Sequence, residues 1–216
     1  MTLYYVYLAC LLFSAIMAFV SGNALKSRRL FLFIPYLFLL FIQETFIFFY
    51  TQQSPQASTA IVYNIYKPAT TLFFAIIYYR IPFNAPVRRL IIGMMTVYFL
   101  IAIVSFCFIQ SIKVYNSYLS LAGSIVITCL GIFFLFNYFS LDNHAEEKHW
   151  RPVLWITTGI SMFYPVVNIS FALYKPLLAN QATVFGLNLY QVIPQVMSIF
   201  MYACFAYAFY LCRKKN

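Results

Sequence analysis

Seven predominantly apolar stretches follow one another along this chain, with short connections between them. A helix needs about 20 such residues to cross the hydrocarbon core of a bilayer. Inside lipid every backbone N–H and C=O group has to be paired within the protein, and a helix pairs them within one segment. We therefore predict an all-α fold, a polytopic bundle of seven transmembrane helices, near residues 3–20, 30–50, 58–79, 88–112, 118–139, 152–174 and 188–212.

The composition is typical of a membrane protein and argues against several other classes. Hydrophobic residues make up 64% of the 216 residues and charged residues only 8%, whereas soluble domains carry about 25% charged residues. The apolar stretches leave no room for a soluble domain of about 50 residues. We expect a single transmembrane domain over residues 1–216 and no enzymatic activity. Because the five cysteines form no Cys-x-x-Cys pair, we also expect no metal site and no cofactor.

The basic residues predict how the chain is oriented. Cytoplasmic loops carry an excess of Lys and Arg, and one side of the predicted bundle collects eleven of the fourteen. These are Lys26, Arg28, Arg29, Arg80, Arg88, Arg89, Lys148, Arg151, Arg213, Lys214 and Lys215. The opposite side holds only Lys113 and Lys175. We expect the N-terminus outside and the C-terminus in the cytoplasm.

This orientation also explains the net charge of +10. The basic residues flank apolar stretches singly and in pairs, so we expect the lipid bilayer as a partner and no nucleic acid. No Lys or Arg precedes the first apolar stretch, so we expect a true membrane span there and not a cleavable signal peptide. The predicted location is the cytoplasmic membrane of a bacterium.

Two ionisable residues interrupt consecutive spans, Glu44 and Lys67. A lysine at the centre of a membrane helix costs roughly 2.5–3.5 kcal/mol or more, so such residues face partners or cavities. At a rise of 1.5 Å per residue, Glu44 lies ~9 Å and Lys67 ~14 Å below the expected outer ends of their helices. Since a lysine side chain can extend toward the membrane surface over this difference, we predict a Glu44–Lys67 ion pair.

Further polar side chains share helix faces in the expected outer half of the bundle, and two interpretations stay open. Polar groups can simply hold helices together, each contributing ~0.6 kcal/mol on average. Alternatively they line a cavity, open to the outside, that binds a small ligand. The pocket hypothesis names Glu44, Asn64, Lys67, Thr71, Asn168, Gln191 and Gln195. Prolines at positions 68, 165 and 194 lie near these groups and can kink their helices.

One acidic segment, residues 142–151, contains both histidines. A zinc-protease helix needs the spacing His-Glu-x-x-His, and the order His-Ala-Glu-Glu-Lys-His found here does not provide it. We expect a solvated cytoplasmic loop and, as the alternative, a surface for a cytoplasmic partner protein. The contact residues of that surface are Asp142, His144, Glu146, Glu147 and His149.

Two patches carry a resemblance to a protein group. Residues 64–89 combine a polar half, an aromatic half and a basic turn, and residues 152–159 read Pro-x-x-Trp-Ile-x-x-Gly. Both patches resemble small uncharacterised bacterial seven-transmembrane-helix proteins, which are often encoded beside sensor kinases. The resemblance implies a sensory or signalling role, but it implies no site residues because the group has no assigned activity.

Together these features predict a sensory or signal-relay membrane protein. A small ligand would enter the outward-facing polar pocket, and a separate cytoplasmic signalling protein would read the resulting change. The alternative is a small-solute membrane transporter, which needs a second polar route through the inner half of the bundle. We expect no membrane enzyme, because no nucleophile–base set accompanies Glu44 and Lys67.

Overall fold

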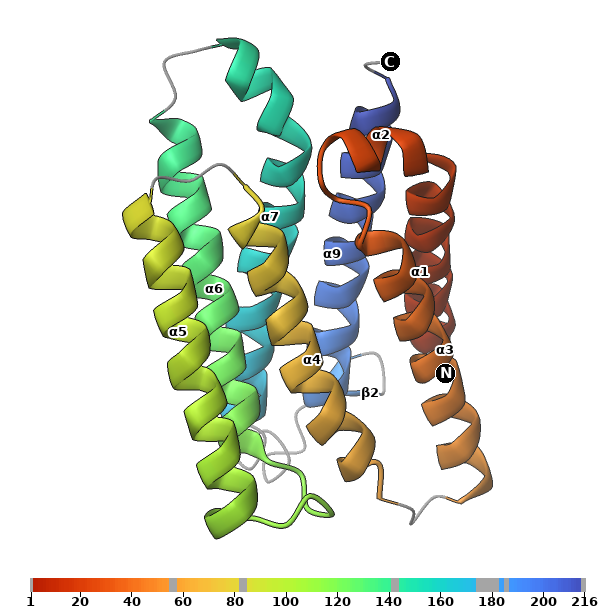
Figure 1. The fold of residues 1–216 in the computed structure, drawn as a ribbon. Coiled ribbons are helices and arrows are strands. Elements are labelled where there is room, and N and C mark those ends of the chain that lie inside the picture. Colours follow the sequence, from red (N-terminus) through yellow and green to blue (C-terminus); the bar gives the residue numbers. More distant parts are fainter. Residues whose placement is uncertain are drawn as a thin grey trace. The chain divides into compact units, whose positions relative to one another are not determined.

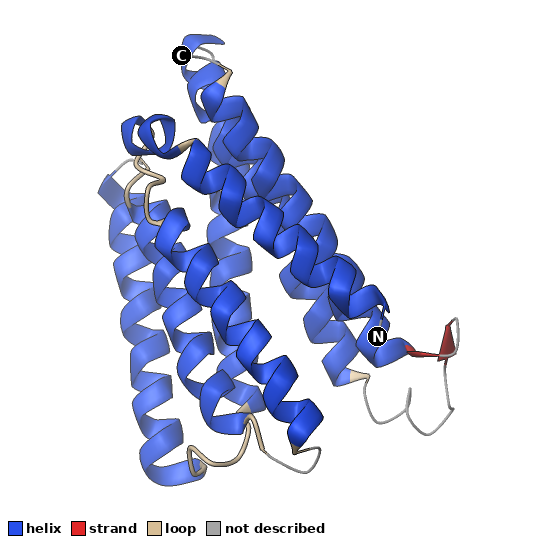
Figure 2. Ribbon diagram, turned by 90° about the vertical axis from the view of Figure 1, so that its right-hand side faces the viewer, coloured by secondary structure: helices blue, strands red, loops and turns tan. Residues whose placement is uncertain are grey.

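The computed structural model describes residues 2–54, 58–81, 85–140, 144–173, 183–184 and 187–214. Its helices are α1 (Thr2–Val20), α2 (Gly22–Ser27), α3 (Phe33–Gln53), α4 (Ala60–Tyr79), α5 (Ala85–Val104), the π-helical turn η1 (Ser105–Ile109), α6 (Ser117–Phe139), α7 (His144–Ala172) and α9 (Leu189–Arg213) (Figure 1). Two antiparallel two-residue strands, β1 (Thr183–Val184) and β2 (Leu187–Asn188), precede α9 (Figure 2). The predicted all-α fold is confirmed.

Within the described residues, seven helices are long and apolar enough to cross a membrane, which confirms the predicted number of spans. Their apolar segments are Leu3–Val20, Phe33–Gln53, Ala60–Tyr79, Ala85–Ile109, Ser117–Phe139, His149–Ser170 and Val192–Arg213. The protein is therefore an integral, multi-pass membrane protein. The orientation with the N-terminus outside stays a prediction.

The connection between the first two spans contains a helix of its own, α2. Its end is closed by Arg29, which has a φ of 61° in the left-handed region. The N–H groups of Arg29 and Leu30 bind the carbonyl oxygens of Lys26 and Leu25 at 3.2 and 2.9 Å. This pair of bonds is a Schellman motif, which ends a helix and reverses the chain. Leu25 is buried and anchors the short helix.

The acidic segment differs from its prediction. Helix α7 begins at His144, eight residues before the predicted start at residue 152, so the acidic segment is helical from His144 onward. Pro152 lies inside α7 and does not begin it. A proline lacks one backbone N–H, so it removes a single helical hydrogen bond and need not terminate a helix. The expected loop was therefore wrong for residues 144–151.

The described chain falls into two compact units, Met1–Glu44 with Gly131–Asn216 (unit 1) and Thr45–Leu130 (unit 2). In unit 1, α7 and α9 pack closely at Gly159. A Cβ added there would lie 3.0 Å from the Cβ of Cys204 and 3.2 Å from the carbonyl oxygen of Met201. A small residue lets two membrane helices approach at such short range.

In unit 2, the helices α4, α5 and α6 meet at Gly123 of α6. A Cβ added there would lie 2.5 Å from Oγ1 of Thr71 and 3.1 Å from the hydroxyl oxygen of Tyr98. Thr71 and Tyr98 are both almost completely buried. Any side chain at position 123 would force Thr71 or Tyr98 to shift, so glycine allows this close contact in the core of unit 2.

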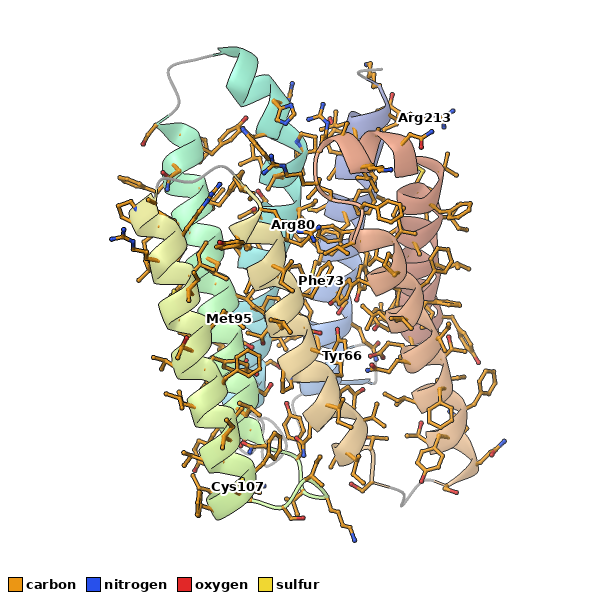
Figure 3. All side chains as sticks on the ribbon, viewed as in Figure 1. Tyr66, Phe73, Arg80, Met95, Cys107 and Arg213 are labelled. Carbon is orange, nitrogen blue, oxygen red and sulfur yellow. The ribbon has the colours of Figure 1, made fainter. Side chains whose placement is uncertain are left out.

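Basic residues gather at one end of each unit. In unit 1, α2, the start of α7 and the end of α9 lie at the same end, where Figure 3 labels Arg213. The buried Arg28 joins two of these elements by donating a hydrogen bond from Nη1 to the carbonyl oxygen of His149. In unit 2, Arg80 follows α4, and the guanidinium of Arg88 in α5 lies 5.9 Å from the ring centroid of Tyr79.

Candidate functional site

Glu44 lies in α3 next to tyrosines of α1 and α9, all within unit 1. Tyr4 donates its hydroxyl to the backbone carbonyl oxygen of Glu44 at 3.0 Å. The Glu44 carboxylate interacts electrostatically with the phenols of Tyr4 and Tyr202. The phenol of Tyr36 also interacts electrostatically with that of Tyr202. The carboxylate itself is only partly buried.

The tyrosines form a continuous series of rings. The ring centroids of Tyr4 and Tyr7 are 5.4 Å apart, and those of Tyr7 and Tyr202 are 5.9 Å apart. The Tyr7 and Tyr202 phenols also lie within hydrogen-bonding range of each other. We call this set the Glu44 cluster, and it consists of Tyr4, Tyr7, Tyr36, Glu44 and Tyr202. It offers one carboxylate acceptor and several phenol hydroxyls inside a membrane-spanning bundle.

An apolar groove of about 360 Å³ reaches Tyr202 between α1 and α9. Its walls include Phe13 and Met17 of α1 and Ala206 and Tyr210 of α9. Tyr202 therefore lines the groove and also belongs to the Glu44 cluster. Since Phe13 and Tyr210 are exposed on membrane-spanning segments, the groove is open to the lipid phase.

Tyr202 also begins an aromatic series along α9. The centroids of Tyr202 and Phe205 are 6.0 Å apart, and those of Phe205 and Phe209 are 6.5 Å apart. Phe33, the first residue of α3, makes T-shaped ring contacts with both phenylalanines, with ring centroids 5.5 and 5.6 Å apart. Because Phe33 follows Arg28 by five residues, this series connects the Glu44 cluster with the basic end of unit 1.

Lys67 lies in α4 and is partly buried. It belongs to unit 2, whereas Glu44 belongs to unit 1, so the Glu44–Lys67 ion pair stays a prediction. The carbonyl oxygen of Lys67 accepts a hydrogen bond from the Thr71 hydroxyl at 3.0 Å. Thr71 packs at Gly123 in the core of unit 2.

Asn64 of α4 holds the connection between η1 and α6. Its Nδ2 donates to the carbonyl oxygens of Ile112 and Val114, both at 2.8 Å, and its Oδ1 accepts from the N–H of Asn116 at 2.9 Å. Asn116 in turn donates to Ser105 Oγ and accepts from the N–H of Leu119 at 3.0 Å. Asn64, Asn116 and Ser105 are all buried, so this network organises a loop within unit 2.

The remaining predicted pocket residues lie on α7 and α9. Asn168 and Gln195 are both partly buried. Asn168 follows Gly159 by nine residues on α7, and Gln195 precedes Cys204 by nine residues on α9. Because α7 and α9 run in opposite directions (Figure 1), both lie ~14 Å from the Gly159–Cys204 contact, toward the same end of unit 1. Gln191 is also on α9, but its side chain lies outside the described residues.

The predicted partner-contact residues are described only in part. Asp142 lies outside the described residues, and so do the side chains of His144, Glu146 and Glu147 in the first turns of α7. His149 is exposed, and its ring packs against the Trp150 ring with centroids 4.7 Å apart. The Arg28 hydrogen bond fixes the backbone at this position.

Sequence reasoning did not identify the tyrosines of the Glu44 cluster as site residues. The available signal was the spacing of Tyr4 and Tyr7, which places them on one helix face beside a span that contains a carboxylate. Comparison of the chain with models of protein families, with curated proteins and with solved structures finds no match.

Proposed function

We propose that this protein relays a signal across the membrane. The Glu44 cluster is the ligand-binding input site, and a separate cytoplasmic protein receives the signal. One observation carries the proposal. Tyr202 is shared by the Glu44 cluster, the α1–α9 groove and the aromatic series toward the basic end of unit 1. A ligand that displaces Tyr202 therefore acts on all three at once.

The input is a small, membrane-borne ligand. The groove volume of about 360 Å³ lies in the range of roughly 300–1,000 Å³ that is usual for ligand pockets. The groove is apolar along its walls and reaches the Glu44 cluster through Tyr202, so it suits a molecule with an apolar body and one polar group. That polar group would compete for the hydroxyl of Tyr202 and for the Glu44 carboxylate.

The output passes along α9 and the start of α3. Displacement of Tyr202 changes the packing of Phe205, Phe209 and Phe33, which are completely buried and cannot adjust singly. Phe33 is connected through the chain to α2, where Arg28 holds the start of α7 at His149. With the predicted orientation this end faces the cytoplasm, so a partner protein would bind at the start of α7 and the end of α9.

The transporter alternative needs a polar route from the Glu44 cluster to the basic end. In the part of unit 1 that the structure describes, the intervening core includes Phe33, Phe205 and Phe209, each with 0% exposure, and its polar side chains on the α1 side are only the small hydroxyls of Ser14 and Ser21. A tightly packed aromatic core blocks the passage of a polar solute, since desolvating polar groups there costs several kcal/mol. This core favours relay over transport.

Cross-linking in native membranes, followed by purification and mass spectrometry, tests the proposal. We expect a cytoplasmic signalling protein at near-equal amounts, cross-linked through His149 or the end of α9. Glu44→Gln should alter its yield, because the input site then lacks its charge. A solitary protein that also takes up solutes into vesicles would replace this proposal with the transporter.

A further inference from the structure

A second apolar groove, of about 500 Å³, lies within unit 2 between α5 and α6. Its walls include Gly93, Val97 and Ile101 of α5 and Ala122, Ile125 and Val126 of α6. The α5 residues recur every four positions and form one stripe along the helix. A Cβ added at Gly93 meets nothing within 4 Å, so the stripe has an open gap at this position.

The length of the groove matches one leaflet of a bilayer. The α5 wall extends from Leu90 to Ile101, which is ~16 Å at a rise of 1.5 Å per residue. Half of the hydrocarbon core is about 15 Å thick. Both walls lie in apolar segments that are long enough to span the membrane. A groove of this length accommodates an extended acyl chain from the headgroup level to the bilayer midplane.

Two arginines directly precede Leu90, the first α5 residue of the groove wall. Arg89 precedes Gly93 by four residues and so continues the same stripe, and Arg88 lies beside it. Unit 2 contains no Asp or Glu anywhere in residues 45–130. Among the described residues, the buried Nε of Arg88 has no hydrogen-bond partner. The two guanidinium groups therefore have no carboxylate of their own unit to pair with.

We infer that this groove binds an anionic phospholipid, with its phosphate on Arg88 and Arg89 and one acyl chain between α5 and α6. Guanidinium groups bind phosphate oxygens in pairs through parallel N–H donors. Moving an acyl chain from the bilayer into this groove changes its free energy little, because both surroundings are apolar. The headgroup charge therefore selects the lipid, and the groove fixes its position.

A second copy of the chain is a poorer occupant of the same surface. Helix α5 of another molecule would bring its own Arg88 and Arg89 close to these two, and unit 2 supplies no acidic residue to offset the repulsion. An anionic phosphate instead attracts both guanidinium groups at once. The charge of unit 2 thus favours lipid over a homodimer contact.

The test uses the full-length protein and native mass spectrometry. Phosphatidylglycerol and phosphatidylcholine with identical acyl chains are added in equal amounts, and the bound fraction of each is measured. We expect the wild type to retain phosphatidylglycerol in preference. Arg88→Gln and Arg89→Gln should each lower that preference by about fivefold. Lys113→Gln, a basic residue in the loop between η1 and α6, is the matched control and should leave it unchanged.

Filling the groove tests the position of the acyl chain separately. A Cβ added at Gly93 meets nothing within 4 Å, so Gly93→Leu should place its side chain in the open gap and should not lower the melting temperature in detergent. A photoreactive acyl chain should then cross-link to α6 several-fold less than in the wild type. The matched control is Ile92→Phe, which adds bulk at an exposed position outside the groove.

Three results would overturn the inference. One is equal retention of both lipids by the wild type. Another is complete displacement of phosphatidylglycerol by inorganic phosphate with no acyl-chain cross-link, which would indicate a free-phosphate site. The third is a cross-linked dimer, without bound lipid, that Gly93→Leu disrupts, since the occupant would then be a second copy of the chain.

Discussion

The backbone N–H of Asn116 donates to Oδ1 of Asn64 at 2.9 Å, and this bond ties α4 to the chain segment that precedes α6. An asparagine side chain can donate two hydrogen bonds and accept two. Asn64 uses three of these four within the loop. One acceptor position is left for any ligand, so the observed role of Asn64 is chiefly structural.

Replacing Asn64 should therefore destabilise unit 2. We expect Asn64→Ala to lower the free energy of unfolding by about 2–4 kcal/mol, because it removes three buried hydrogen bonds and leaves their partners unpaired. Denaturant unfolding in detergent micelles measures the change. Gln110→Ala is the control, since Gln110 makes one exposed side-chain bond to the carbonyl of Tyr115 and should contribute little. Equal effects of the two substitutions would contradict this account.

Replacing each of two glycines of unit 2 by alanine should change the stability of the protein in opposite directions. Gly123→Ala forces a Cβ to 2.5 Å from Oγ1 of Thr71, and overpacking of this kind costs about 1–3 kcal/mol. Gly93→Ala meets nothing within 4 Å and should stabilise α5 by up to about 1 kcal/mol through helix propensity. Thermal melts of both variants provide the comparison.

A rescue experiment separates the Gly123 clash from a general effect of glycine loss. Adding Thr71→Ala to Gly123→Ala removes the nearest atom, so the double variant should regain part of the lost stability. The same addition to Gly93→Ala should give no gain. If Thr71→Ala fails to rescue Gly123→Ala, the close approach of α4 and α6 is not the cause of the destabilisation.

The membrane spans were predictable because each requires a long apolar segment, and the structure confirms all seven. The ends of the helices were harder to predict, because polar segments outside lipid can be helix or loop with little difference in composition. α2 forms because Leu25 is buried and Arg29 adopts a left-handed backbone that sequence does not reveal. The first turns of α7 are hard to predict because they are polar and precede the apolar segment that the sequence places near residue 152.

The candidate site was predictable only in part. Glu44 stood out because a carboxylate inside a membrane span is costly. Its tyrosine neighbours did not, since the chain contains 19 tyrosines and most positions in apolar spans accept one. The role of Asn64 depends on a loop about fifty residues away in the sequence, which only the folded structure brings to it.

Glu44 and Tyr202 should be the residues on which signalling depends. Glu44→Gln removes the charge and Tyr202→Phe removes the hydroxyl but keeps the ring, so both should change the yield of the cross-linked cytoplasmic partner by several-fold. Tyr118→Phe is the matched control, because Tyr118 of α6 is 72% exposed and belongs neither to the groove nor to the Glu44 cluster. An unchanged yield in both variants, with normal melting temperatures, would exclude the Glu44 cluster as the input site.

Arg28 should control the start of α7. It is 8% exposed and donates to the carbonyl oxygen of His149, and a hydrogen bond from a charged group contributes about 1.5–3 kcal/mol. Arg28→Gln should therefore increase amide hydrogen exchange in the first described turns of α7 and weaken partner cross-linking through His149. Lys26→Gln, an exposed basic residue of α2, should do neither. Since the Glu44 cluster is untouched in both variants, faster exchange with unchanged cross-linking would show that the partner binds away from this helix end.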